Sequence, residues 1–193
     1  MTIPDLSLNP DLEEIPMQTT RRLSLIASTA MIIALAGCAG LTTPTPTAQA
    51  RVEARSGSQV NGTISFTPNG DLVVVEASVS GLPPGPHGFH VHEAGDCSAA
   101  DASSAKGHFN PLGHPHGHHG KVERHAGDLP NLVADASGSA TYRAEVRGLR
   151  LTGGASGILG RSVVIHADAD DYQSQPAGNS GKRIACGIIA ARQ

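Results

Sequence analysis

The sequence predicts an all-β fold, in which about eight antiparallel strands form a sandwich or barrel that carries two large loops. Two observations predict this class. Apolar and polar residues alternate over much of the chain after Ala50, which is the period of a half-buried strand. The 193 residues include 23 glycines and 13 prolines but only 3% aromatic residues, a mixture that suits short strands and turns better than a helical bundle.

Each expected strand is a short alternating or apolar run bounded by turn residues. The expected strands are 51–54, 60–66, 71–79, 88–93, 132–135, 140–146, 162–166 and 184–190. The turn at 67–70 contains Asn69-Gly70, a strong hairpin signal, so the second and third strands are expected to pair. The Gly- and Pro-rich segment 81–85 interrupts the pattern before the next strand.

Two long segments, 94–130 and 167–182, have no regular apolar period. The first is rich in glycine, histidine, serine and aspartate. A loop of this length in a compact domain is either functional or disordered. Its many potential metal ligands favour a functional loop.

The first 37 residues have the features of an export signal. Arg21 and Arg22 precede an apolar run of 15 residues, 23–37. A membrane span needs about 20 such residues, so the run fits the core of a signal peptide. It ends in Leu-Ala-Gly before Cys38, which looks like a bacterial lipobox and implies cleavage before Cys38 and lipidation of that cysteine. An ordinary signal peptide or an amphipathic anchor are the alternatives.

Residues 1–16 carry four acidic residues and three prolines ahead of the basic pair, whereas signal peptides start with positive charge. Met17 is therefore the expected start of translation. Residues 38–50, rich in threonine and proline, are expected to form a tether, and 51–193 the folded domain. The expected location is outside the cytoplasm, on a membrane that faces the periplasm or the cell surface.

The charge balance is close to neutral, with 14 basic against 17 acidic residues. Residues 1–37 hold two of the basic and four of the acidic residues, so the remainder has 12 against 13 and a net charge of −1. No basic stripe indicates a nucleic-acid partner. Any attraction of a charged substrate must come from the local arrangement of side chains.

Cys97 and Cys186 are the two cysteines left after Cys38. In an exported protein a disulfide between them is the default expectation. The alternative is two free, buried thiols.

Seven side chains with metal-binding groups lie in the central and C-terminal parts of the chain: His90, His92, His108, His116, His125, Asp128 and His166. His90 and His92 are expected on one face of a strand, because residues i and i+2 point the same way. Imidazole suits zinc, copper, iron and nickel. Seven ligands exceed the four of one tetrahedral ion, which indicates two neighbouring metals. The nearby His114, His118 and His119 are interpreted as a solvated, loosely metal-collecting tract.

Five motifs resemble the copper/zinc superoxide dismutase family, in the family's order and over roughly 52–190. They are GFHVHEAGDC (88–97), GHFNP (107–111), RHAGDLPNL (124–132), GRSVVIHADADD (160–171) and GKRIACGIIA (181–190). The resemblance implies an eight-stranded antiparallel Greek-key barrel and disproportionation of superoxide to O2 and H2O2. Superoxide is then the expected partner, with copper and zinc as cofactors.

The resemblance also implies a role for each candidate residue. The implied copper ligands are His90, His92, His108 and His166, and the implied zinc ligands are His108, His116, His125 and Asp128. His108 would bridge the two ions and take a proton when its bond to copper breaks. Arg183 resembles the active-site arginine and Asp170 an aspartate that links the two sites, while His87 resembles a structural position. His116 is chosen by its spacing from several neighbouring histidines.

Two other classes of function are alternatives to the enzyme. One is a copper or zinc store or carrier of the same fold that uses the 114–119 tract, and the other is a purely structural sandwich. The full set of implied copper ligands and Arg183 favour the enzyme, because a carrier needs no such arginine. The sequence leaves open whether the protein is a monomer or a homodimer.

Overall fold

The computed structural model describes residues 47–192, and the segments for which a signal peptide, a start at Met17 and lipidation of Cys38 are predicted lie outside these residues. The described part is all-β, so the predicted class is confirmed. It has nine strands and one short 3-10 turn, η1, at Ser103–Ala105. The strands are β1 Thr47–Ala54, β2 Asn61–Asn69, β3 Leu72–Ser80, β4 Gly85–His87, β5 Phe89–His92, β6 Leu132–Ala134, β7 Ala140–Arg147, β8 Ser162–His166 and β9 Arg183–Arg192. None of the helical turns within 47–192 is long and apolar enough to span a membrane.

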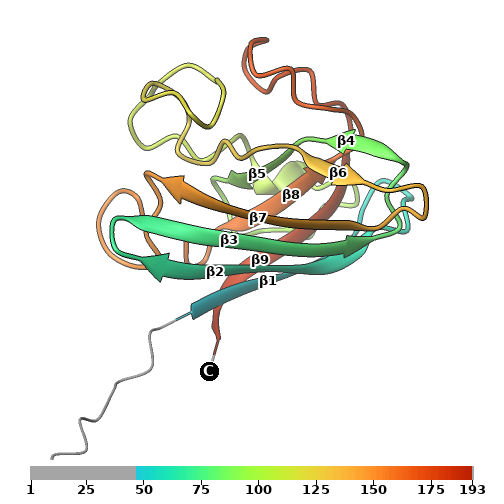
Figure 1. Ribbon diagram of the computed structural model, residues 1–193, viewed down its shortest axis with the longest axis horizontal. Helices are drawn as coiled ribbons and strands as arrows, with labels where there is room; N and C mark the ends of the chain where they lie inside the picture. The colour runs from blue at the N-terminus through green and yellow to red at the C-terminus, as the bar shows by residue number, and fades with distance from the viewer. Residues whose placement is uncertain (1–46, 193) are drawn as a thin grey trace, which may run out of the picture. The chain divides into compact units, whose positions relative to one another are not determined.

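Seven of the strands form one curled antiparallel sheet, in the order β5-β8-β9-β1-β2-β3-β7, as Figure 1 shows. β4 and β6 form a second, two-stranded sheet. β4 runs into the edge strand β5 through Gly88, and β6 packs beside the other edge strand, β7. The small sheet therefore connects the two edges of the large one, and together they form an incomplete barrel. The two long loops lie at one side of it.

The predicted hairpin is confirmed by the pairing of β2 with β3. Asn69 lies opposite Leu72, so Gly70 and Asp71 alone form the connection. Gly70 has a φ of 59°, in the left-handed region where a side chain would be strained. Gly70 is the first of the two loop residues, the position at which a type II′ hairpin loop needs glycine, while Asn69 and the rest of the expected turn belong to β2.

β1 begins earlier than the expected domain boundary at residue 51. Thr47–Ala50, which was assigned to the tether, instead forms the first half of this strand. Ala48 and Ala50 are fully buried, and they lie opposite Phe66 and Ile64 of β2. The prediction failed because alanine gives little hydrophobic signal, although its small side chain fits between two neighbouring strands.

β4 lies where only a break in the pattern was expected. Its residues pair with β6, with Pro86 opposite Val133. A proline cannot donate to a ladder, so it is tolerated in a short edge pair such as this one. The strand matters to the site, because it leads directly into β5 and its two histidines.

The core lies inside the curled sheet. Its largest fully buried side chains include Phe66, Phe89, Phe109, Ile64, Leu129, Leu132, Leu149, Ile158, Ile165 and Ile189. Val91 is also fully buried, as expected for the residue between His90 and His92 on a strand. This packed core gives β5 and β8 a rigid support for the side chains that face the loops.

The predicted disulfide is present between Cys97 and Cys186, whose Cα atoms are 5.7 Å apart. It belongs to a small buried cluster with Ala102, Ala105 and Val164. The bond therefore ties the start of the 94–130 loop to β9, three residues from Arg183.

Candidate metal centre

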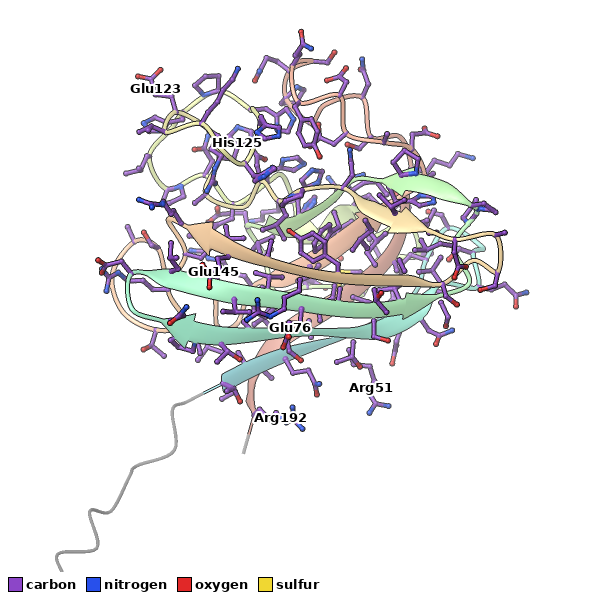
Figure 2. All side chains as sticks on the ribbon, in the orientation of Figure 1. Arg51, Glu76, Glu123, His125, Glu145 and Arg192 are labelled. Atoms are coloured by element: carbon purple, nitrogen blue, oxygen red, sulfur yellow. A yellow bond between two sulfur atoms is a disulfide. The ribbon has the colours of Figure 1, made fainter. Side chains whose placement is uncertain are left out.

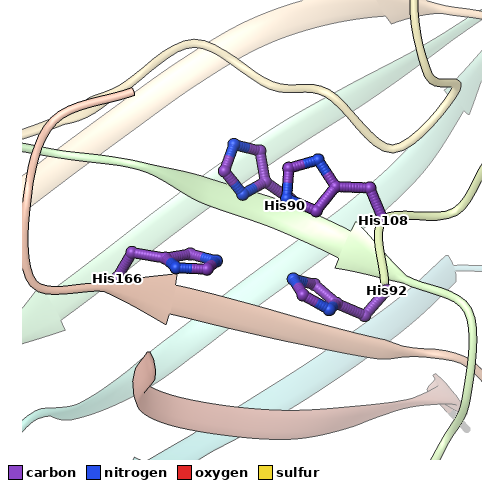
Figure 3. Close-up of side chains that lie close together, drawn as sticks. All are labelled: His90, His92, His108 and His166. Atoms are coloured by element: carbon purple, nitrogen blue, oxygen red, sulfur yellow. The ribbon is translucent and has the colours of Figure 1, made fainter. Parts of the chain in front are cut away.

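Four histidines converge at the edge of the sheet, as Figure 3 shows. His90 and His92 come from β5 and His166 ends β8, which pairs with β5. His108 enters from the long loop and forms an isolated bridge with His92. The four ligand atoms offered by these rings all lie within 4.8 Å of one another. We call this group the four-histidine set.

One nitrogen of each ring in this set is buried and has no hydrogen-bond partner within the described residues. These atoms are His90 Nδ1, His92 Nε2, His108 Nε2 and His166 Nε2. Four buried, unpaired polar atoms in one place would be costly unless a cation joins them. The donor set is all imidazole, which suits copper. The residues present therefore fit a copper ion.

The other ring nitrogens are fixed by protein groups. His90 Nε2 donates to Asp170 Oδ2 at 2.8 Å, and His92 Nδ1 donates to the Lys106 carbonyl at 2.9 Å. His166 Nδ1 lies 3.3 Å from the Gly181 carbonyl oxygen. These bonds select the tautomer whose free lone pair faces the centre, which is the form that binds a metal.

Burial keeps these rings neutral. It lowers the pKa of His108 to about 3, and the neighbouring His90 adds to the effect. Burial also lowers the pKa of His92 and of His166 well below the usual value, with nearby imidazoles contributing. Because neutral imidazole offers one free lone pair, His90, His92 and His166 can each bind a metal without losing a proton near neutral pH. His108 would have to lose its one remaining N–H proton to offer a nitrogen to each set.

A second set shares His108 and is completed by three residues of the long loop, His116, His125 and Asp128. Figure 2 places His125 among the loops above the strands. The Nδ1 atoms of the three histidines lie 2.9, 3.0 and 3.4 Å from Asp128 Oδ1. Tetrahedral zinc with bonds of about 2.0 Å would hold its ligand atoms about 3.3 Å apart. We call this group the zinc set, because its donors fit zinc with no open position.

Charge in the zinc set is concentrated on Asp128 and His116. Burial alone would raise the pKa of Asp128, but hydrogen bonds from His108, His116 and His125 hold it far below its usual range. Burial alone would lower the pKa of His116, but hydrogen bonds to Asp128 and Asp170 raise it to about 9. Asp128 is thus an ionised ligand that can offset the charge of a cation.

Asp170 joins the two sets. Its Oδ2 accepts from His90 at 2.8 Å and its Oδ1 accepts from His116 Nε2 at 2.9 Å. Gly178 is packed so tightly here that a Cβ atom would overlap Asp170 and lie 2.8 Å from His116 Nε2. The structure therefore places Asp170 where the linking aspartate was expected.

His116 is the member of the crowded 114–119 tract that lies in the zinc set. It is buried, whereas His118 is exposed and stacks near His119, with ring centroids 4.0 Å apart. His114 is not among the clustered ligand atoms either. His87 also lies outside both sets, and its ring nitrogens are 3.0 and 2.7 Å from the carbonyl oxygens of His166 and Pro83.

Arg183 lines a small cavity of about 260 Å³ together with His92, His108 and His166 of the four-histidine set. The cavity is lined by His92, Gly107, His108, Asn110, His125, His166, Pro176, Ala177 and Arg183. A register shift after Ile165 puts Arg183 opposite His166 on the neighbouring strand. Its Nη1 donates to the Ala102 carbonyl at 2.8 Å, and its other N–H groups make no hydrogen bond to the described residues. A fixed positive fork thus faces the candidate copper site.

Several positioning residues were not predicted. The side chains of Asn110, Asn131 and Gln175 each make two hydrogen bonds to the backbone of a loop residue. Asn131 holds Asp170, Asn110 holds His114, and Gln175 holds His116. Asn110 and Asn131 lie within recognised motifs, but the motifs did not show what they hold. The contacts of Asn131 and Gln175 join segments 39 and 59 residues apart, so no local pattern could reveal them.

Comparison with known proteins agrees with this geometry. The family model described as copper/zinc superoxide dismutase (SODC) matches residues 60–189. A curated relative from Deinococcus radiodurans, "Superoxide dismutase [Cu-Zn]", is 41% identical over 183 residues, which cover 89% of this chain and 98% of the relative. The crystal structure of the clock protein EA4 is similar with a TM-score of 0.69 and 41% identity, covering 76% of this chain and 95% of that one. This chain belongs to the copper/zinc superoxide dismutase family.

Proposed function

We propose that this chain is a superoxide dismutase that converts two superoxide anions and two protons into O2 and H2O2. Copper would be held by the four-histidine set and zinc by the zinc set. The main support is that His108 offers one ring nitrogen to each set, at the foot of a small cavity that Arg183 lines. A shared imidazole couples an all-imidazole site with a closed site that contains a carboxylate.

When bound, copper supplies the one-electron chemistry, taking an electron from one superoxide and giving it to another, whereas zinc cannot change oxidation state. The protein's part is to hold four imidazoles, to admit a small anion and to provide protons. His90 and His92 are kept in place by β5, and the hydrogen bonds of their other nitrogens fix the ring orientations.

Arg183 would attract and orient the anion. The net charge of the chain is −3, so the field that draws in superoxide must be local. The guanidinium donates one hydrogen bond to the Ala102 carbonyl, and its other N–H groups make none to the described residues. The Cys97–Cys186 disulfide anchors β9 three residues from Arg183. A cavity of about 260 Å³ has room for a diatomic anion.

His108 would supply a proton at Nε2. This atom has no hydrogen-bond partner within the described residues, and the ring also lines the cavity. Nδ1 is directed at the zinc set, 2.9 Å from Asp128 Oδ1, so only Nε2 is able to exchange a proton with the cavity.

A metal store or carrier of the same fold is the main alternative, and one assay separates the two. The rate of superoxide consumption is measured for protein loaded with copper and zinc, for protein loaded with zinc alone and for metal-free protein. We expect fast consumption with copper and zinc bound, and none from the metal-free chain. Slow consumption at full copper occupancy would contradict the enzyme and favour the carrier.

We also propose that the protein is exported and anchored through a lipid on Cys38, with residues from 38 up to β1 as the tether. The support is the apolar run 23–37 and the Leu-Ala-Gly-Cys sequence at its end. Cys38→Ala should release the processed protein from membranes, which fractionation and mass spectrometry of the N-terminal peptide would detect. A mature protein that begins at another residue, or that stays in the membrane after the change, would refute the anchor.

A further inference from the structure

The 114–119 tract poses a problem of register. Histidines occur at 114, 116, 118 and 119, and the first three are evenly spaced by two residues. In an extended chain, residues two apart face the same way. A slip by two residues would therefore bring His114 or His118 to the place of His116. Residues 113–118 belong to no strand, so no ladder fixes their position.

Two side-chain amides hold this segment instead. Gln175 Oε1 accepts from the His116 backbone N–H at 2.8 Å, and its Nε2 donates to the His116 carbonyl at 2.9 Å. Asn110 Oδ1 accepts from the His114 N–H at 3.0 Å, and its Nδ2 donates to the His114 carbonyl at 2.8 Å. Each amide thus pairs with both backbone groups of one residue, as a neighbouring strand would.

His118 and His119 are held by hydrogen bonds from within their own loop. His118 Nδ1 accepts from the Gly120 backbone N–H at 3.1 Å, and its carbonyl accepts from Lys121 at 2.8 Å. The His119 carbonyl accepts from Arg124 at 2.8 Å. Only at His116 does a side chain from the second long loop, 167–182, reach the tract's backbone. Asp170, which lies in the same loop, accepts a hydrogen bond from Nε2 of the His116 ring.

We propose that Gln175 is a positioning residue that selects His116 as the zinc ligand by fixing the register of the 114–119 tract, with Asn110 as its local counterpart. The selection extends the proposed function, because it assumes that the zinc set binds zinc. Gln175 itself touches no metal. Its loss frees the segment to present a neighbouring histidine in place of His116.

The test is a double-mutant cycle on zinc affinity. Zinc alone is titrated against a competing chelator into metal-free protein for wild type, Q175A, the pair variant H114A/H118A, and the triple combination. We expect H114A/H118A to bind as wild type does and Q175A to bind about 10-fold more weakly, since outer hydrogen-bond partners are worth 10- to 100-fold. The triple variant should lose about a further 10-fold, because neighbouring histidines no longer substitute.

A spectroscopic readout separates register from simple loosening. Cobalt(II) in place of zinc has visible bands that depend on its ligands and their geometry. We expect Q175A to change these bands and the added H114A/H118A changes to remove the new species. Q175E, which keeps the acceptor but loses the donor, should show an intermediate loss of about 3-fold and serves where Q175A folds poorly.

Gln173 offers a matched control, because it lies in the same loop and its side chain makes no hydrogen bond within the described residues. Q173A should bind zinc as wild type does. Equal zinc affinity in Q175A and wild type, or a loss in Q175A that H114A/H118A leaves unchanged, would overturn the selection by Gln175. A wild-type chain that does not bind zinc would overturn the proposed function itself.

Discussion

The two candidate metal sites are built by different means, although they share His108. Three ligands of the four-histidine set lie on β5 and β8, where the pairing of His90 with Val164 is part of a regular ladder. The three other ligands of the zinc set come from one loop that has no strand of its own. A regular ladder therefore fixes the strand ligands of the first site, whereas side-chain hydrogen bonds and a single main-chain bridge from Asp128 to His90 hold the loop ligands of the second.

Asp128 shows how the loop compensates for the missing ladder. Its Oδ1 faces the three histidines of the zinc set, and its Oδ2 accepts from the backbone N–H groups of Gly117 and His125 at 3.1 and 3.0 Å. One carboxylate thus serves as ligand and as the centre of the loop. We expect the zinc set to depend on its ion for order far more than the four-histidine set does.

Removing a metal ligand that lies on a strand should have the largest effect on superoxide consumption. It also tests whether the zinc set binds its ion independently of the four-histidine set. His92→Ala is expected to lower superoxide consumption on the order of 10³-fold, well beyond the 10- to 100-fold of an outer partner. Zinc content and far-UV circular dichroism should stay unchanged, because β5 keeps its ladder. H118A, outside both sets, is the control. Loss of zinc together with copper would show that the two sites are one unit.

Asp170→Asn should have the next largest effect, because this carboxylate links His90 of one set to His116 of the other. An amide group would turn an N–H donor toward a ring N–H of His90 or His116, each of which now donates to a carboxylate oxygen. We expect affinity for copper and zinc to fall about 10- to 100-fold each, measured by chelator competition. A loss confined to one metal would mean that Asp170 supports only that site.

Arg183→Ala is expected to slow the bimolecular reaction about 10-fold at low salt while copper stays bound, because the local field that draws in the anion is lost. The dependence of the rate on ionic strength should also weaken. Lys182→Ala, at an exposed neighbour, should change the rate much less. An unchanged rate at low salt in the Arg183 variant would refute the steering role.

Selective removal of zinc should have the smallest effect on the strands. It tests directly whether the loop that carries the zinc set depends on its ion while the strands do not. We expect faster amide hydrogen exchange across 107–130, while β5 and β8 exchange as before. The reason is that the loop loses the ion around which Asp128 organises it. Equal protection in the loop with and without zinc would show that side-chain hydrogen bonds alone hold it.

Alternation predicted most strands, and motifs predicted all residues of the two metal sets except His116, which was chosen by its spacing. These signals are local in sequence. The misses were Ala48 and Ala50, whose burial depends on neighbouring strands, and Pro86, whose strand pairs only at an edge. Gln175 was missed because its partner, His116, is 59 residues away. The amino-acid type of a ligand can be recognised in a sequence, but the groups that position it depend on how distant loops meet.

The central claim is that His108 bridges copper on the strands and zinc in the loop. Anomalous diffraction from metal-loaded crystals, measured on both sides of the copper and zinc absorption edges, locates each element separately. The account predicts copper among His90, His92, His108 and His166, and zinc among His108, His116, His125 and Asp128. Copper bound at His114, His118 or His119, or a zinc ion without His108 as ligand, would contradict it.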